Sequence, residues 1–469
     1  MSRLLVVSNR APIEVARAPD GPRLTRTVGG LAGALDAALR AHGGVWVAWV
    51  GAYGDDEVPA GTAGLAYPIR VVHLREREVN NYYNGFANQV LWPLCHSFPG
   101  RCSFQGAYWT AYRQANERFA ATVQSAAQPG DVVWIHDFHL CLVPGLLRAS
   151  ALPLRLGVFW HIPFPAPSVF GILRWRAELL TGLLGADLIG FQTDQDARNF
   201  LESVRQFLEL PVTASTRRII LPGREVQVTV LPIGIDHASF RAEVANAAVR
   251  ARAARLRETL RADIVMLGVD RLDYTKGIPE RLQAFERFLE RRPELRRRVC
   301  FVQVAVPSRD RVPEYRALKR AIDETVGRIA GRFTHEGRSP VQYLYTALGR
   351  EHLAAYYLAS DIAVVTPLRD GMNLVAKEYV ACRGGDDGVL VLSEFAGAAQ
   401  DLREAVIVNP YDPEDVRRGL ETAVAMPPGE RRRRMHVLDR QIASRDLGWW
   451  TAAFLDRLNA AGTPTASAA

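Results

Sequence analysis

Residues 366–380 hold the arrangement most suited to chemistry. They read Thr-Pro-Leu-Arg-Asp-Gly-Met-Asn-Leu-Val-Ala-Lys-Glu-Tyr-Val and follow a β-branched run at 361–365 that predicts a short buried strand. Gly371 lies in the turn, and Asn373 is a good cap for a helix that begins at Leu374. Because a helix start presents free N–H groups and a positive dipole end, the pattern indicates a phosphate site. An ordinary capped strand–turn–helix explains the same residues equally well.

Two cations follow another predicted strand, at 263–269. Arg271 and Lys276 would repel each other there unless an anion lay between them, and a diphosphate would satisfy both. Solvated or ion-paired surface cations are the alternative. Arg309 follows the next strand, at 299–306, and its cation is better suited to a phosphate on a second substrate.

Asp137 follows the predicted strand 130–136, so its carboxylate lies at the carboxyl end of that strand as an acceptor for sugar hydroxyls. The adjacent His136 and His139 could ligate a metal, but no carboxylate or thiol framework supports them. Asp270 and Asp273 have the spacing DxxD instead of the DxD pattern of metal-dependent sugar transfer. We therefore expect no metal and no cofactor.

Three weaker indications lie in the first half of the chain. His161 ends the strand 155–161, where two following prolines hold the exit rigid, and this position favours a functional histidine over a structural one. Gly29 and Gly30 precede an apolar helix and predict either a second anion cradle or a plain turn. Tyr83 and Trp92 lie in an Asn-rich segment, as core residues or as a wall for a sugar ring.

The elements that must position these residues alternate between short apolar strands and helices, which predicts an α/β protein with parallel sheets. A break at 231–236 separates two such series, so we predict two doubly wound, Rossmann-like domains, 1–235 and 236–446, that face across a cleft at the strands' carboxyl ends. A terminal helix, 447–461, packs back on the first domain, and the tail 462–469 is disordered. The predicted strands are 3–8, 45–50, 130–136, 155–161, 187–192, 263–269, 299–306, 361–365, 388–392 and 405–408, with a hairpin at 216–231. Helices are predicted at 30–41, 107–126, 139–149, 169–184, 195–208 and 241–260.

Composition indicates a soluble globular protein. The 469 residues are 48% hydrophobic and 23% charged, with no apolar run long enough to span a bilayer and no signal peptide at the start. Five cysteines without CxxC spacing predict reduced thiols and a cytoplasmic location. The net charge of +8 comes largely from arginine runs without interleaved aromatics, which favours a solvated face over a nucleic-acid partner.

The motifs SNR, VGGL, YYNGFxN, LWP, HDFHL, HIPFP, GFQT, PIGID, RLDYTKG, PLRDGMNLVAKEY and VNPYD occur in this order between Ser8 and about Asp412. Together they resemble the trehalose-6-phosphate synthase family, retaining glycosyltransferases of the two-domain GT-B architecture. The chain departs from the family in a compact connection at 210–228 and an unusual loop at 97–105. Both could border the cleft, so the resemblance defines the acceptor less firmly than the donor.

The resemblance implies that glucose moves from a nucleotide-activated donor, expected to be UDP-glucose, to glucose 6-phosphate, without a metal. The implied acceptor residues are Arg10, Tyr83, Trp92, Asp137 and Arg309, with the two arginines at the phosphate. The implied donor residues are Gly29, Gly30, Arg271, Lys276, Asp370, Gly371, Met372, Asn373, Leu374 and Glu378, the last at the nucleotide ribose. The implied catalytic group consists of His161, Arg271, Lys276 and Asp370, of which His161 and Asp370 contact the donor glucose.

The sequence has no well-placed carboxylate pair of the kind that glycosidases use, which favours attack on the face that the leaving group departs from. Several alternatives stay open: a glucosylglycerol-phosphate synthase, a relative that couples pseudo-sugars, or a sugar-phosphate binding regulator without turnover. A phosphorylase-like enzyme with Lys377 as a cofactor Schiff base is another. We expect small-molecule partners, with a homodimer or homotetramer possible and no membrane contact.

Overall fold

The computed structural model describes residues 2–18, 21–26, 30–54, 64–150, 152–309 and 312–461. The chain divides into two compact units, which we describe separately. The first comprises residues 1–232 and 450–469, and the second comprises 233–449. The sequence places the corresponding boundaries after residues 235 and 446. The predicted tail, 462–469, lies outside the described residues.

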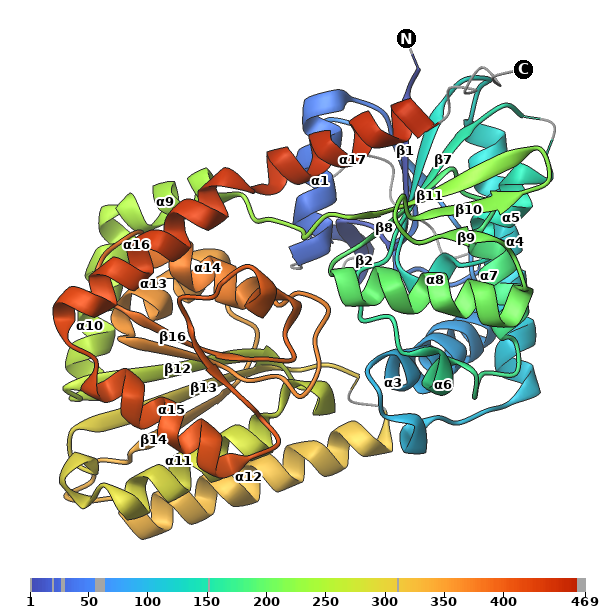
Figure 1. The fold of residues 1–469 in the computed structure, drawn as a ribbon. Coiled ribbons are helices and arrows are strands. Elements are labelled where there is room, and N and C mark those ends of the chain that lie inside the picture. The colour runs from blue at the N-terminus through green and yellow to red at the C-terminus, as the bar shows by residue number, and fades with distance from the viewer. Residues whose placement is uncertain are drawn as a thin grey trace. The chain divides into compact units, whose positions relative to one another are not determined.

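The second unit is built on a parallel six-stranded sheet with the order β14-β13-β12-β15-β16-β17. Numbered along the chain, this order is 3-2-1-4-5-6, the arrangement of the dinucleotide-binding fold. Helices α11, α12 and α15 cover one face of the sheet, and α10, α13 and α14 cover the other (Figure 1). The strands are β12 (Ile264–Arg271), β13 (Val299–Val306), β14 (Val341–Tyr345), β15 (Ile362–Val365), β16 (Val389–Ser393) and β17 (Val406–Val408). The helices are α9 (His237–Ala245), α10 (Ala247–Leu260), α11 (Ile278–Arg291), α12 (Pro313–Phe333), α13 (Arg350–Ala359), α14 (Leu374–Arg383), α15 (Pro413–Ala425) and α16 (Pro428–Ser444).

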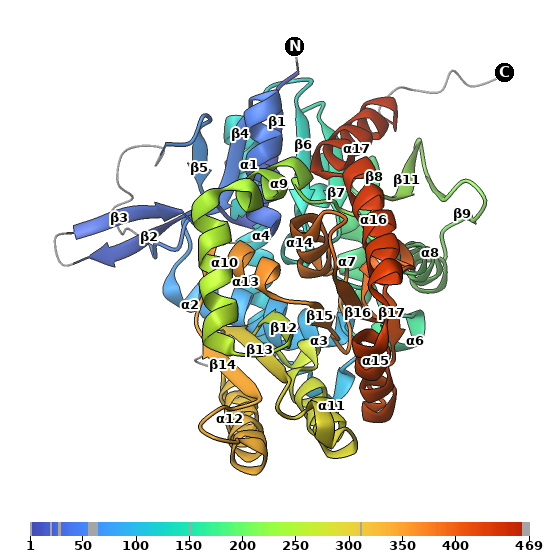
Figure 2. The ribbon, with the colours of Figure 1, turned by 90° about the vertical axis from the view of Figure 1, so that its left-hand side faces the viewer.

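The first unit repeats this topology in a larger sheet. Its nine strands run β5-β4-β1-β6-β7-β8-β11-β10-β9, so the first six again have the order 3-2-1-4-5-6 when the separate β2–β3 hairpin is set aside. That hairpin stands away from the main sheet (Figure 2). The strands are β1 (Leu4–Arg10), β2 (Ile13–Ala18), β3 (Gly21–Arg26), β4 (Val45–Trp49), β5 (Ile69–Val71), β6 (Val132–His136), β7 (Arg155–Phe159), β8 (Leu188–Phe191), β9 (Val212–Thr213), β10 (Arg218–Leu221) and β11 (Arg224–Val230). The helices are α1 (Gly30–His42), α2 (Glu76–Val79), α3 (Trp92–Cys95), α4 (Gly106–Ala126), α5 (Val143–Arg148), α6 (Pro167–Phe170), α7 (Arg176–Leu183) and α8 (Asp194–Leu208), with a π-helical segment, Asn80–Leu91, between α2 and α3.

The terminal helix α17 (Leu447–Ala461) packs on this first sheet from Trp450 onward. Two glycines allow the close approach. A Cβ at Gly157 of β7 would lie 2.7 Å from Leu458 Cδ2, and one at Gly190 of β8 would lie 3.0 Å from Phe454 Cε2. Phe454 also stacks on Trp134 at 4.7 Å between ring centroids.

Most predicted elements are confirmed within two residues of their bounds, including the antiparallel hairpin β10–β11. The single helix predicted at 241–260 is wrong: Asn246 interrupts it and caps α10, its side chain accepting from the N–H of Ala248 at 2.9 Å. The helix predicted at 169–184 is likewise two helices, α6 and α7, and that at 139–149 is shortened to α5. Strands β2, β3, β5, β9 and β14 were not predicted.

The described residues include no helix long and apolar enough to cross a membrane. All five cysteines are free thiols. Burial raises the pKa of Cys102 and of Cys300 to about 11, so these thiols stay protonated at neutral pH.

Candidate functional site

In a 3-2-1-4-5-6 sheet, ligands bind where the strand order reverses, because the loops that leave strands 1 and 4 diverge there and open a crevice. In the second unit that point lies between β12, which ends at Arg271, and β15, which precedes the turn 366–373. In the first unit it lies between β1, which ends at Arg10, and β6, which precedes Asp137. Predicted donor residues therefore lie at the switch point of the second unit, and predicted acceptor residues lie at that of the first.

In the second unit, Lys276 and Asp370 lie in direct contact. The ammonium of Lys276 donates to Asp370 Oδ2 at 2.5 Å, and both side chains are largely buried. The amide of Asn373 donates to the same carboxylate oxygen at 3.0 Å, while its Oδ1 accepts from the N–H of Ala376 and caps α14. The structure thus joins three predicted donor residues through one carboxylate.

Asp273, which was assigned no role from the sequence, is a second anion among the cations. Its fully buried carboxylate accepts from Arg309 Nη1 at 3.0 Å and from the Tyr315 hydroxyl at 3.0 Å. Burial alone raises the pKa of Asp273, but Arg309, Arg271 and Lys276 outweigh burial and hold the pKa below its usual value. All three predicted cations therefore act on this one group.

The prediction that Arg271 and Lys276 need an external anion is thus incomplete. Asp273 and Asp370 supply two negative charges within the protein, against three positive charges from Arg271, Lys276 and Arg309. One positive charge remains in excess, so the group still favours an anionic ligand.

Backbone amides add to this positive field at the start of α14. Among the described residues, no protein group accepts a hydrogen bond from the N–H groups of Gly371 through Val375. Asn373 adopts a left-handed conformation, with φ 75°, which turns the chain sharply into the helix. Unsatisfied amides and the helix dipole at one point form an anion site.

Glu378 lies one turn into α14 and accepts a hydrogen bond from the Tyr357 hydroxyl at 2.8 Å. Burial raises the pKa of Glu378 above its usual value, although Tyr357 and Arg350 oppose this. Lys377, the candidate for a Schiff base, donates to the carbonyl of Ile233 at 2.7 Å. Its amine therefore contacts a residue outside the predicted donor group.

At the first unit's switch point, Arg10 lies among aromatic rings. Its guanidinium is 4.3 Å from the ring centroid of Trp49 and 5.6 Å from that of Tyr83, and it lies 3.8 Å from Glu14 in an exposed ion pair. Tyr83 in turn stacks on His139 at 5.7 Å. The structure thus brings the predicted Arg10 and Tyr83 together, with the cation on an aromatic surface.

Asp137 has an unusual backbone conformation. With φ 73° and ψ 168°, it occupies a region that almost only glycine adopts, and such strain is commonly found at functional sites. Its Oδ1 accepts from the backbone N–H of His161 at 3.3 Å, so two predicted residues from neighbouring strands meet here.

The His161 ring is held by two partners that sequence reasoning did not select. Its Nε2 lies 3.1 Å from His136 Nδ1, and its Nδ1 lies 3.4 Å from the amide nitrogen of Gln192. Because that amide nitrogen can only donate, His161 Nδ1 accepts and Nε2 carries the proton toward His136. Burial lowers the pKa of His161 to about 3, and burial together with His161 lowers that of His136 well below its usual value, so both rings are neutral at pH 7.

Trp92 is only 5% exposed and packs on His96 and Phe138, with ring centroids 4.1 and 5.9 Å away. It can therefore offer a ligand only a narrow edge. The helix α1 begins at Gly30 as expected, whereas Gly29 lies outside the described residues. In the part of the chain that the structure describes, no group of three or more His, Cys, Asp or Glu residues could hold a metal ion.

Residues 2–460 match the sequence profile of glycosyltransferase family 20. The chain belongs to glycosyltransferase family 20. A family relative, the trehalose-6-phosphate synthase of Mycolicibacterium smegmatis, is 43% identical over 471 residues, which cover 98% of this chain and 93% of that protein. The two Rossmann-like units of this family 20 chain agree with the predicted GT-B architecture; the cleft between them stays a prediction.

Two solved structures with bound ligands resemble this family 20 chain closely. An alpha,alpha-trehalose-phosphate synthase (UDP-forming) from Burkholderia xenovorans, in complex with glucose-6-phosphate, has a TM-score of 0.89 at 35% identity and covers 98% of this chain and 100% of its own. An E. coli structure bound with UDP-2-fluoro glucose has a TM-score of 0.89 at 36% identity, covering 97% and 99%.

Sequence reasoning on this family 20 chain missed Asp273, His136 and Gln192 as parts of the site. Asp273 follows the same strand as Arg271 and Lys276, so the need to balance two adjacent cations could have identified it. Gln192 lies in the motif GFQT, which marked the segment but not the partner, because the contact with His161 depends on the pairing of β7 with β8.

Proposed function

We propose that this protein is a retaining glucosyltransferase that moves glucose from UDP-glucose to glucose 6-phosphate, giving α,α-trehalose 6-phosphate and UDP. Membership of glycosyltransferase family 20 supports the class of reaction. The substrates named for the two ligand-bound relatives, glucose-6-phosphate and a UDP-glucose analogue, support the choice of acceptor and donor.

The observation that carries the proposal is the cation cluster at the second unit's switch point. Arg271, Lys276 and Arg309 surround two carboxylates with one positive charge in excess, beside the unsatisfied amides at the start of α14. A nucleoside diphosphate satisfies this arrangement, because its oxygens can accept hydrogen bonds from the arginine guanidiniums, the lysine ammonium and the backbone N–H groups together.

In the proposed reaction, the bond between glucose C1 and the diphosphate oxygen breaks while a hydroxyl of the acceptor forms the new C1–O bond. The acceptor's proton passes to the departing phosphate oxygen, so no protein base is consumed. Lys276, Arg271 and the helix dipole stabilise the charge that develops on the diphosphate. Asp370, held by Lys276 and Asn373, is oriented as an acceptor for the hydroxyls of the donor glucose.

We assign the acceptor to residues at the first unit's switch point. Arg10 would hold its phosphate, and Asp137, Tyr83 and the edge of Trp92 would hold the sugar. For Arg309, the ion pair with Asp273 supports a role in the cation cluster, and its assignment to the acceptor phosphate stays a prediction. A cytoplasmic location, a homo-oligomer, and the absence of cofactor, metal and nucleic-acid partners also stay predictions.

The deciding experiment is a nucleotide-release assay that crosses UDP-, GDP- and ADP-glucose with glucose 6-phosphate and glycerol 3-phosphate. We expect UDP-glucose with glucose 6-phosphate to turn over fastest and to give only the α,α product by NMR. Faster turnover with glycerol 3-phosphate would contradict the acceptor, and no turnover with any pair would favour a binding regulator. A glucosyl group trapped on a carboxylate would contradict direct transfer to the acceptor.

A further inference from the structure

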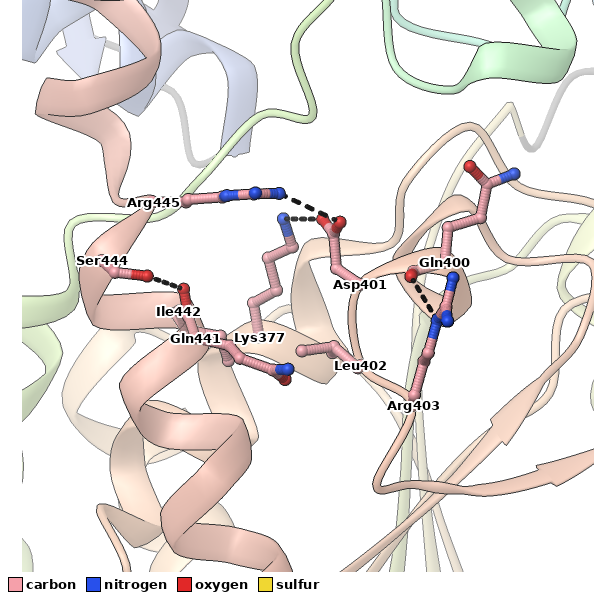
Figure 3. Close-up of a pocket in the computed structure, with 9 residues that line it drawn as sticks. All are labelled: Lys377, Gln400, Asp401, Leu402, Arg403, Gln441, Ile442, Ser444 and Arg445. Carbon is pink, nitrogen blue, oxygen red and sulfur yellow. Dashed lines mark hydrogen bonds and ion pairs between the residues drawn. The ribbon is translucent and has the colours of Figure 1, made fainter.

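A cavity in the second unit is lined by no residue of the predicted donor or acceptor groups. Its volume is about 390 Å³, and its walls come from Lys377 of α14, residues 400–403, and the last turn of α16 with Arg445 behind it. Figure 3 shows the ends of Lys377 and Arg445 both directed at the carboxylate of Asp401.

The cations that line this cavity are poorly balanced. Lys377, Arg403 and Arg445 contribute three positive charges and Asp401 one negative charge. Asp401 lies 3.8 Å from the Lys377 ammonium and 3.7 Å from the Arg445 guanidinium, both beyond the range of a good hydrogen bond. The carboxylate therefore neutralises neither cation closely, and the cavity keeps an excess of positive charge.

The use of lysine at this position is itself informative. The chain has 58 basic residues, of which only three are lysines: Lys276, Lys319 and Lys377. Lys276 lies in the cation cluster and Lys319 is on the surface, whereas Lys377 is 4% exposed and lines the cavity. Lysine is thus rare in this chain, and at Lys377 a compact ammonium lines the cavity in place of a guanidinium fork.

We propose that this cavity binds a phosphate dianion, either free or as the monoester of a small polyol. The Lys377 ammonium and the Arg445 guanidinium would hold the phosphate oxygens from two sides, as a point charge and a fork. The side chain of Gln441, which also lines the cavity, is suited to polyol hydroxyls. The bound anion would compensate the cost of burying Lys377.

A phosphate bound in the cavity would affect the contacts at the boundary of the second unit. The Lys377 ammonium donates to the carbonyl of Ile233, the first residue of the second unit, and Arg445 lies four residues before the last residue of that unit, Trp449. An anion that draws the Lys377 ammonium away from Ile233 therefore acts where the chain passes between units. This inference does not depend on the proposed transferase activity.

Lysine NMR tests the proposal, because a full-length protein with ¹³C-labelled lysine gives signals from only three side chains. Burial lowers the pKa of Lys377 to about 8, and a bound dianion favours the charged form. Inorganic phosphate should raise that pKa saturably by about 1–3 units relative to sodium chloride of equal ionic strength. Glycerol 2-phosphate shows whether the monoester binds as well, and Lys319 should not respond to either.

Arg445→Gln should abolish the Lys377 response, whereas Arg432→Gln, which removes the same charge from α16 outside the cavity, should preserve it. A Lys377 signal that ignores both phosphates, or that responds equally in Arg445→Gln, overturns the proposal. UDP supplies the independent check: it should move the Lys276 signal and leave Lys377 unchanged. Failure of UDP at Lys276 would count against the donor site and not against this cavity.

Discussion

The two units share one topology and differ in chemistry. Both sheets have the order 3-2-1-4-5-6, and both place predicted residues where that order reverses. The second unit's switch point holds two ion pairs, one between Lys276 and Asp370 and one between Arg309 and Asp273. The first unit's switch point adds to Arg10 and Asp137 a pair of buried neutral histidines and several aromatic rings.

This difference shows that topology determines where a ligand binds, while side chains determine which ligand it is. A net positive group of side chains beside unsatisfied backbone amides suits the diphosphate of an activated sugar. A group of aromatic faces, one arginine and one strained aspartate suits a sugar that carries a single phosphate. Substitutions in one unit can therefore perturb one binding chemistry without the other.

The largest effect is expected from Lys276→Ala in the second unit. Its loss removes one of the groups that stabilise the departing diphosphate, which commonly costs about 2.7–4 kcal/mol of barrier, or about 100- to 1000-fold in kcat. Steady-state kinetics with saturating UDP-glucose measure the loss, and circular dichroism checks that the fold is kept.

Lys319→Ala is the matched control, since Lys319 lies in the same unit in an exposed pair with Asp323. It should change kcat by less than twofold and stability by less than about 0.5 kcal/mol. If Lys276→Ala were as active as this control, Lys276 would have no part in the transfer step.

The strands that position the site could be predicted because each is a short β-branched or apolar run followed by a turn. The runs before Arg271 and Asp370 are of this kind. Because both form parallel strands of one sheet, the donor residues that follow them lie at the same edge of that sheet. The cap at Asn373 could also be predicted, because it needs only a local hydrogen bond.

Long-range pairings could not be predicted in this way. The contact of His161 with Gln192 depends on the register of two strands, and the positive φ of Asp137 depends on the packing around it. The break at Asn246 was missed although asparagine is a good cap, because charged, helix-favouring residues continue on both sides. The local sequence therefore predicts each helix and strand, whereas the contacts between side chains of different elements depend on how the strands pair.

The histidine pair predicts a pH dependence confined to the first unit. The pKa values of His136 and His161 are lowered in the folded protein, so the unfolded chain binds more protons below pH 6.5 and stability falls as the pH falls. The loss should be about 1.4 kcal/mol per histidine for each pH unit below 6.5. In the second unit, the lowered pKa of Asp273 shifts the corresponding loss to pH values below about 3.8.

Tryptophan fluorescence can isolate this effect, because eight of the nine tryptophans belong to the first unit. Urea midpoints measured between pH 7.5 and 5.5 should fall for the wild type and fall less for His136→Gln. The exposed His436→Gln should follow the wild type. A midpoint independent of pH would mean that the histidine pair is protonated in the folded state without cost.

The smallest effect concerns backbone strain, which both units store at their switch points, in Asp137 with φ 73° and in Asn373 with φ 75°. Alanine and glycine each remove the side-chain hydrogen bonds of these residues, but only glycine adopts positive φ without strain. Asp137→Gly should therefore be more stable than Asp137→Ala by about 1 kcal/mol, and Asn373→Gly more stable than Asn373→Ala by a similar amount. Urea unfolding followed by tryptophan fluorescence for the first pair and by circular dichroism for the second measures both differences.

Glu209, a left-handed residue at the end of α8 with φ 53°, is the control away from either site, and its Gly and Ala variants should differ in the same direction. Equal stability of the Gly and Ala variants at position 137 alone would mean that the first unit relaxes its strained aspartate, and the symmetry between the two switch points would then be one of topology only.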